Sequence, residues 1–252
     1  MISRLLFALL GLTCALRLPA ADATRTPGTL VAVHGAWAGG WHFKKIATLL
    51  EAKGWKVHRP SLSGLGEHFH TAHKEIGLAT HVDDIVNFIL FEDLRDVILL
   101  GHSYGGMVIT GVADRIPERI ARLVYFEAVL PVDGESLLGI RKAGASDLEK
   151  MAKEGFVIPT WVRPGKPFPI DVPHPLRTFT DPISLKNAAA TAKIPSTYIL
   201  SVEPGGKPEA DDFFAASERA KARGWPVVLM EGDHNPHWRQ PEAVAQLLLS
   251  IP

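Results

Sequence analysis

The chain has 252 residues, of which 46% are apolar, and it carries 27 basic and 27 acidic side chains. This length and composition suffice for one globular domain with a large core. The balanced charge provides no net positive charge that would attract nucleic acid or an anionic membrane surface, so we expect neither as a partner.

The first residues have the pattern of an export signal. Arg4 precedes an apolar stretch from Leu5 to Leu16, and small residues follow at Ala21 and Ala23. The apolar stretch is too short for a good membrane span. We therefore predict a signal peptide over 1–23, a periplasmic or secreted mature protein, and no stable membrane insertion after cleavage. An uncleaved anchor is the alternative.

After the predicted signal, apolar runs typical of strands alternate with amphipathic helical stretches. The expected strands are Leu30 to Val33, Lys56 to His58, Val97 to Leu100, Leu123 to Phe126, Thr197 to Leu200 and Val227 to Met230; the expected helices lie near 41–53, 81–91, 105–114 and 212–223 and from Pro241 onward. This alternation predicts an α/β domain over 24–252, with a mostly parallel sheet covered by helices on both faces.

One segment, from Val132 to Ala190, interrupts the alternation. It is rich in proline, glycine and charge, and Trp161, Phe168 and His174 are scattered through it. Because it stands between two expected strands, we predict an insertion over one edge of the sheet. Long insertions of this kind are commonly lids or binding loops, so we expect a small cap.

The strand that begins at Val97 ends in the sequence Gly101-His102-Ser103-Tyr104-Gly105. The two glycines permit a sharp turn from strand to helix that exposes the serine at the start of the helix. A glycine-rich turn with an incidental serine is the alternative. The position of the motif between a buried strand and a helix favours a nucleophilic Ser103.

A serine nucleophile needs a base to accept its proton and a carboxylate to orient that base. His234 lies in a loop directly after the strand that begins at Val227. We predict that His234 is the base, because the chain order serine, acid, histidine places the base last. His237 is the less favoured alternative, since it lies between that loop and the last helix.

Four segments together resemble the α/β-hydrolase superfamily: "LVAVHGAWAGGW", "GHSYGG", "LVYFEAVLP" and "EGDHNPHWRQPEAV". The resemblance is to the small esterases that include plant methyl-ester hydrolases, salicylate-binding esterases and hydroxynitrile lyases. It extends from Thr29 to the end of the chain and is weakest across the insertion. It implies an α/β-hydrolase fold with an eight-stranded sheet, a serine hydrolase, and neither a cofactor nor a catalytic metal.

The resemblance leaves the catalytic acid open between two places. In much of the family the acid follows the strand that here is Thr197 to Leu200, but Pro204 occupies the aligned position. Glu127 follows another buried strand, 24 residues beyond the serine, as in some haloalkane dehalogenases. A carboxylate at the end of a buried strand needs a partner, and we therefore favour Glu127. The alternatives are Asp211 or Asp212, and then Glu203.

The resemblance also implies an oxyanion hole formed by the backbone N–H groups of Ala36 and Tyr104. The neighbouring residues Gly35, Trp37, His102 and Met107 are the expected substrate-binding residues. They stand beside the two motifs that bring the backbone close to the substrate.

A run of three histidines, His68, His70 and His73, has the H-x-H-x-x-H spacing of some zinc sites. The aspartate of the metallohydrolase pattern does not accompany it. The preceding residues resemble a hydrolase loop, and we predict no metal there.

The nucleophile and its neighbours limit the classes of reaction that we expect. A serine excludes the alkyl-aspartate chemistry of dehalogenases, and Gly35 stands where the hydroxynitrile lyases carry threonine. We therefore expect hydrolysis of a carboxylic ester, or of a lactone or thioester, of a small and largely apolar substrate through an acyl-serine. The alternatives are a ligand-binding protein with little turnover and a lid-gated lipase. The protein is expected to be a monomer or a homodimer.

Overall fold

The computed structural model describes residues 27–141 and 145–251. The predicted signal peptide over 1–23 lies outside the described residues, so it stays a prediction. Within the described part, no helix is both long and apolar enough to cross a membrane.

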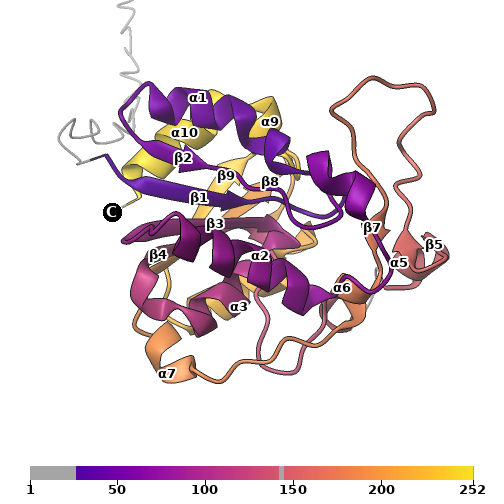
Figure 1. The fold of residues 1–252 in the computed structure, drawn as a ribbon. Coiled ribbons are helices and arrows are strands. Elements are labelled where there is room, and N and C mark those ends of the chain that lie inside the picture. The colour runs from indigo at the N-terminus through magenta and orange to yellow at the C-terminus, as the bar shows by residue number, and fades with distance from the viewer. Residues whose placement is uncertain (1–26, 142–144, 252) are drawn as a thin grey trace, which may run out of the picture.

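The main sheet has six parallel strands in the order β2-β1-β3-β4-β8-β9 (Figure 1). Their bounds are β1 Thr29–Val33, β2 Lys56–His58, β3 Val97–Ser103, β4 Ile120–Ala128, β8 Ser196–Val202 and β9 Val227–Glu231. Each apolar run that predicted a strand is confirmed. The expected number of eight strands is wrong for the described residues. That number came from the resemblance alone, whereas the sequence contains six apolar runs.

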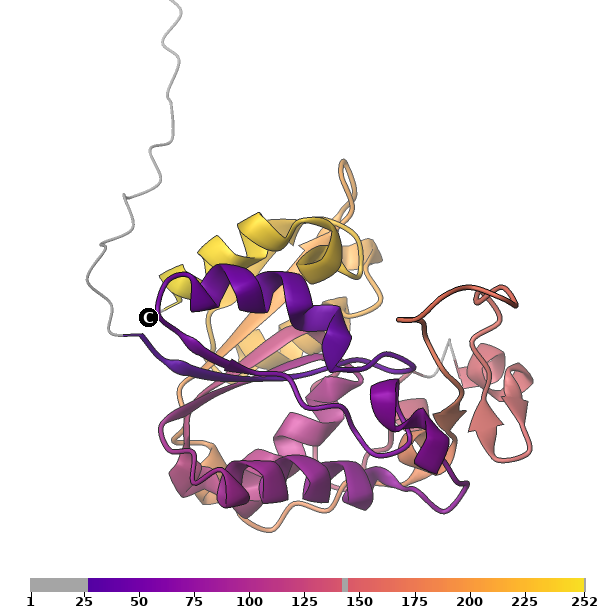
Figure 2. The same cartoon turned by 45° about the horizontal axis from the view of Figure 1, so that its top comes forward.

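Successive residues of a strand face opposite sides of the sheet, and each side has its own core. Leu30 and Ala32 of β1 pack with α1 Lys44–Glu51 and α10 Pro241–Ser250. Val31 and Val33 of the same strand belong to the opposite core. That core is covered by α2 Leu78–Phe91, α3 Gly105–Arg115 and α8 Phe214–Ala222. Two views show α1 and α10 on one face and α2 on the other (Figures 1 and 2).

The remaining elements of the core domain are short. The first predicted helix, near 41–53, is divided into a 3-10 turn and α1. The short elements are η1 Gly40–Phe43, η2 Gly66–Thr71, η3 Pro117–Arg119, η4 Pro208–Ala210 and α9 Pro236–Arg239.

The segment from Val132 to Ala190 contains only short elements. They are α4 Leu137–Ile140, α5 Ala145–Lys150, β5 Ala152–Lys153, β6 Phe156–Val157, β7 His174–Pro175, α6 Arg177–Thr180 and α7 Ala188–Thr191. The three strands form a separate antiparallel sheet. The arrowheads of β1 and β3 point toward the side on which β5, β7 and α6 lie (Figure 1). The part of the insertion that contains β5, β7 and α6 therefore lies beyond the carboxyl ends of the main strands, whereas α7 lies back toward their amino ends (Figure 1).

Candidate active site

Ser103 lies at a cramped junction between β3 and α3. Its backbone has a positive φ of 54°, a conformation that is strained for a residue with a side chain. A Cβ atom on Gly101 would lie 2.7 Å from the carbonyl oxygen of Gly105, and one on Gly105 would lie 2.6 Å from that of Val33. Both positions therefore require glycine. The tight turn leaves the serine half-buried at the beginning of α3.

His234 reaches the serine from the loop after β9. Its Nε2 lies 3.0 Å from Ser103 Oγ, which is hydrogen-bond distance. The ring of Phe213 stacks on the imidazole, with centroids 5.0 Å apart and planes 6° apart. The backbone of the loop is held as well, because His102 Nε2 donates to the carbonyl oxygen of His234 over 2.8 Å. These contacts position His234 Nε2 to accept the serine proton.

Glu127 lies at the end of β4 and is 1% exposed. Its backbone also has a positive φ, of 46°. One carboxylate oxygen, Oε2, accepts the backbone N–H of Ser201 over 2.7 Å, and the other, Oε1, lies 3.6 Å from Nδ1 of His234. The carboxyl group therefore faces the side of the imidazole that is remote from Ser103.

Asp211 forms a side-chain hydrogen bond with Glu127. Burial raises the pKa of Glu127 to about 7 and that of Asp211 to about 6, and each carboxyl faces the other. Two carboxyl groups in hydrogen-bond contact hold one proton between them near neutral pH. Of the two, Glu127 is the more deeply buried and has the higher pKa.

The environment of His234 favours the neutral imidazole. Desolvation by the surrounding groups lowers the pKa of this histidine, and the positive charge of Arg141 lowers it further. Its side chain is 40% exposed, on the pocket side. The base is therefore unprotonated at neutral pH and accessible from the pocket.

Ala36 and Tyr104 line the same pocket as Ser103. Trp37, the residue after Ala36, has a positive φ of 62°. Its backbone N–H donates to His174 Nδ1 over 3.0 Å, and its indole N–H donates to the carbonyl of Val157 over 2.9 Å. The insertion thus holds the loop that contains the predicted oxyanion residue.

The pocket has a volume of about 740 Å³. Its apolar walls come from the core domain and from the insertion. The apolar residues include Trp37, Leu137, Leu148, Met151, Trp161, Phe179 and Phe213. Trp161 packs edge to face against Trp37, with ring centroids 4.9 Å apart. The pocket can therefore enclose a small aromatic or aliphatic group beside Ser103.

Of the four predicted substrate-binding residues, Trp37 lines the pocket. The prediction that His102 and Met107 lie in its wall was wrong. His102 is 2% exposed because it precedes Ser103 on β3 and so faces the opposite side of the strand. Met107 is fully buried on the face of α3 that packs against the sheet. Gly35 lies behind the serine, where a Cβ atom would be 3.0 Å from Cβ of Ser103. Its role is to permit close packing.

The residues that were alternatives for the base and for the acid make other contacts. His237 is buried and forms a hydrogen bond with His42 rather than with Ser103. Asp212 lines the pocket and pairs with Arg141. Glu203 lines the pocket and is exposed. The structure thus places Glu127, with Asp211 behind it, nearest to the predicted catalytic histidine.

Sequence reasoning predicted the insertion as a small cap but did not identify most of the residues that it contributes to the pocket. Arg141 and Met151 line it, and the guanidinium of Arg141 lies 5.2 Å from the ring centroid of Phe213. No periodic pattern identifies these residues, because the insertion contains only short elements. The scattered aromatic residue Trp161 was the available signal.

The run of histidines at which no metal is predicted, His68, His70 and His73, lies on or beside η2. All three side chains are exposed. Among the described residues, the cluster of potential metal ligands is instead formed by His42, His102 and His237.

Comparison with known proteins gives consistent matches. A family model described as the alpha/beta hydrolase family matches residues 30–247. The chain is 34% identical over 241 residues to the carbendazim hydrolyzing esterase of Nocardioides sp. (strain SG-4G), a match that covers 88% of this chain and 98% of that protein. It is 35% identical over 104 residues to salicylic acid-binding protein 2 of Nicotiana tabacum, across 40% of this chain and 39% of that protein.

A solved structure gives a similar result. An extracellular alpha/beta-hydrolase from a Paenibacillus species superposes with a TM-score of 0.73 at 24% identity, over 88% of this chain and 98% of that chain. This likeness supports the fold. Together the matches confirm the resemblance that the four sequence segments indicated.

Proposed function

Since the chain belongs to the alpha/beta hydrolase family and is an esterase-type hydrolase, we propose that it cleaves small, largely apolar carboxylic esters through an acyl-enzyme intermediate on Ser103. The observation that carries this proposal is the 3.0 Å approach of His234 Nε2 to Ser103 Oγ in a pocket whose walls include several aromatic side chains. A serine hydroxyl becomes an effective nucleophile when a neutral imidazole accepts its proton in this way.

The acylation step follows from this arrangement. Ser103 Oγ forms a bond to the ester carbonyl carbon while its proton passes to His234 Nε2. The carbonyl oxygen becomes an oxyanion, which the backbone N–H groups of Ala36 and Tyr104 stabilise. Glu127 stabilises the imidazolium from the Nδ1 side. The tetrahedral intermediate then expels the alcohol, which takes the proton from His234.

Deacylation repeats these chemical steps with water as the nucleophile. His234 accepts a proton from water as the water oxygen attacks the acyl carbon. The second tetrahedral intermediate expels Ser103, which recovers its proton from the imidazolium. The products are a carboxylic acid and a free enzyme, so each turnover consumes one water molecule.

The substrate class is inferred from the pocket walls and from the relatives. Trp37, Trp161 and Phe213 provide aromatic surfaces around the serine. A relative that aligns with 98% of its own length is named for the hydrolysis of carbendazim. We therefore expect the acyl or alcohol group to be a compact aromatic or short aliphatic group rather than a long chain. Carbendazim is one compound to test.

A panel of p-nitrophenyl esters tests this function. The wild type should hydrolyse the acetate, butyrate and benzoate esters and should be slow with the palmitate ester. The Ser103→Ala variant should lose at least about 10³-fold in kcat/KM. Ser250→Ala, which changes an exposed serine on α10, is the matched control and should retain full activity. Absence of turnover for every ester would contradict the esterase proposal and favour a ligand-binding role.

A further inference from the structure

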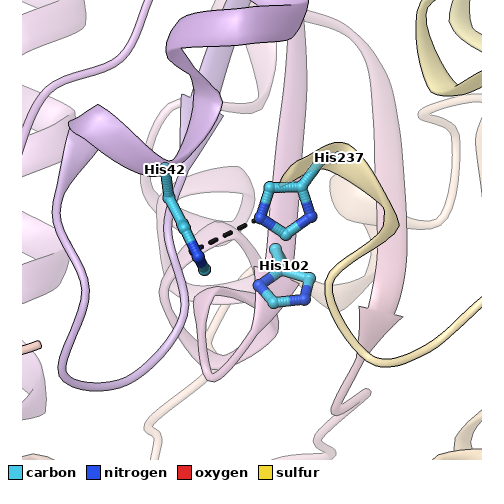
Figure 3. Close-up of side chains that lie close together, drawn as sticks. All are labelled: His42, His102 and His237. Carbon is cyan, nitrogen blue, oxygen red and sulfur yellow. Dashed lines mark hydrogen bonds between the residues drawn. The ribbon is translucent and has the colours of Figure 1, made fainter. Parts of the chain in front are cut away.

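Three histidines that the proposed reaction does not use meet beneath the active site. His42 comes from η1, His102 from β3 and His237 from α9. One ring nitrogen from each can be chosen so that all three atoms lie within 4.8 Å of one another. The close-up shows the three rings gathered around a common space, with nitrogens of His42 and His237 facing each other (Figure 3).

The hydrogen bonds leave part of this cluster unsatisfied. His237 Nε2 and His42 Nδ1 are 3.2 Å apart and share one proton. His102 Nε2 donates to the carbonyl oxygen of His234, so the neutral ring has a bare lone pair on Nδ1. Among the described residues, His102 Nδ1 and His237 Nδ1 have no hydrogen-bond partner. A buried polar atom without a partner costs about 1–3 kcal/mol, and a metal ion that accepts the lone pair of His102 Nδ1 removes that cost.

The cluster is well isolated from water and from carboxylates. His102 is 2% exposed and His237 is fully buried, whereas His42 is half-buried. The partial exposure of His42 provides the side from which a ligand can enter.

We propose that His42, His102 and His237 bind one divalent transition-metal ion of the zinc, cobalt, nickel and copper class. Neutral imidazole nitrogens suit these ions, and three protein nitrogens plus one water form a common tetrahedral set. Metal–nitrogen distances of about 2.0–2.1 Å place the ligand atoms about 3.3 Å apart, so the rings need to move together by about 1.5 Å or less. The His102 hydrogen bond to the His234 carbonyl supplies the outer contact that metal-bound histidines usually make.

Cobalt titration tests the site directly. The protein is freed of any histidine tag, treated with a chelator, and titrated with Co²⁺ while its visible absorption is recorded. We expect about one Co²⁺ per chain, with the intense bands of tetrahedral nitrogen ligation, and displacement by Zn²⁺. The His42→Ala variant should bind at least about tenfold more weakly. His42 is chosen because it is half-buried, and thermal unfolding verifies that the variant folds.

Two further variants separate this site from adventitious binding. His237→Gln should also weaken Co²⁺ binding, while the double variant His68→Ala/His70→Ala, in the exposed histidine run, should bind like the wild type. Absence of saturable binding would overturn the proposal, as would binding that persists in His42→Ala but disappears in the double variant. If Co²⁺ binds but no ester is hydrolysed, the metal site stands and the esterase function fails.

Discussion

At the residue scale, three residues of the pocket wall have backbone conformations that favour glycine. Ser103, Trp37 and Glu127 all have positive φ values, between 46° and 62°. Such strain costs about 1–3 kcal/mol per residue and persists only where surrounding contacts enforce it. Here the enforcing contacts are the close packing of Gly101 and Gly105 around the serine and the hydrogen bonds of Trp37 and Glu127. Three of the six described non-glycine residues with positive φ thus line the pocket, whereas Asp93, Asp96 and Glu154 are exposed elsewhere.

Two substitutions distinguish the roles of the paired carboxyl groups. Glu127→Gln removes the negative charge that stabilises the imidazolium, and we expect kcat/KM for p-nitrophenyl butyrate to fall by about 10²–10⁴-fold. Asp211→Asn retains a hydrogen-bond donor toward Glu127, so kcat/KM should fall by less than about tenfold. Asp83→Asn, which affects an exposed ion pair with Arg115 and lies outside the pocket, is the control and should be nearly neutral. The reverse order for Glu127 and Asp211 would assign the acid to Asp211.

The buried Glu127 also predicts a dependence of stability on pH. Burial raises the pKa of Glu127 to about 7, above the value of about 4.3 in an unfolded chain. The contribution of protonated Glu127 to the free energy of unfolding is therefore complete below about pH 4 and is lost as the pH rises through about 7. Glu127→Gln has no proton to lose, so it should exceed the wild type in free energy of unfolding at pH 8 by on the order of 3 kcal/mol.

Urea denaturation at two pH values measures this effect. The stability difference between Glu127→Gln and the wild type should be large at pH 8 and small at pH 5. An equal difference at both values would show that Glu127 does not titrate between them.

Residue roles were predictable from sequence where a motif determines the local geometry. The motif around Ser103 and the loop with His234 identified two residues that the structure brings together. Glu127 was favoured because a carboxylate at the end of a buried strand needs a partner. The facing direction of His102 follows from alternation along the strand, whereas that of Met107 could not be predicted because it depends on helix packing. The His42 cluster depends on three distant segments meeting, which no local pattern indicates.

At the element scale, the six strands of the main sheet were predictable because each is an apolar run between turns. Their exact ends were not, since β3 and β4 continue to Ser103 and Ala128, past their apolar runs. The elements of the insertion were not predictable either. Its strands have two residues each, too short to show any alternation.

One buried carboxylate anchors the end of the insertion to the core domain. Asp114 on α3 accepts the backbone N–H groups of Lys186 and Asn187 over 2.6–3.0 Å. Asp114→Ala leaves both donors without their charged acceptor and should lower the free energy of unfolding by about 2–4 kcal/mol. The matched control is Asp83→Ala, which removes an exposed ion pair with Arg115 and should cost less than about 1 kcal/mol.

Chemical denaturation of the two variants checks this prediction. Equal losses for Asp114→Ala and Asp83→Ala would mean that the insertion is not held at this point. If Asp114→Ala also raises KM while kcat stays constant, the anchor contributes to the shape of the pocket as well as to stability.

At the scale of the whole molecule, the topology explains why the pocket lies where it does. All strands of the main sheet are parallel, so their carboxyl ends meet at one edge. Ser103, Glu127 and His234 come from the ends of β3 and β4 and from the loop after β9. The part of the insertion that contains β5, β7 and α6 lies beyond the same edge and adds the outer wall (Figure 1). The pocket thus combines residues held at the ends of packed strands with a cover formed by the insertion.

The most direct test of the central claim is the intact mass of the protein after exposure to a fluorophosphonate. An activated serine displaces fluoride and keeps the phosphonyl group, so the wild type should gain the mass of a single adduct. Ser103→Ala should gain none, and Ser250→Ala should react like the wild type. An unmodified wild type, or an adduct that remains in Ser103→Ala, would contradict the assignment of Ser103 as the nucleophile.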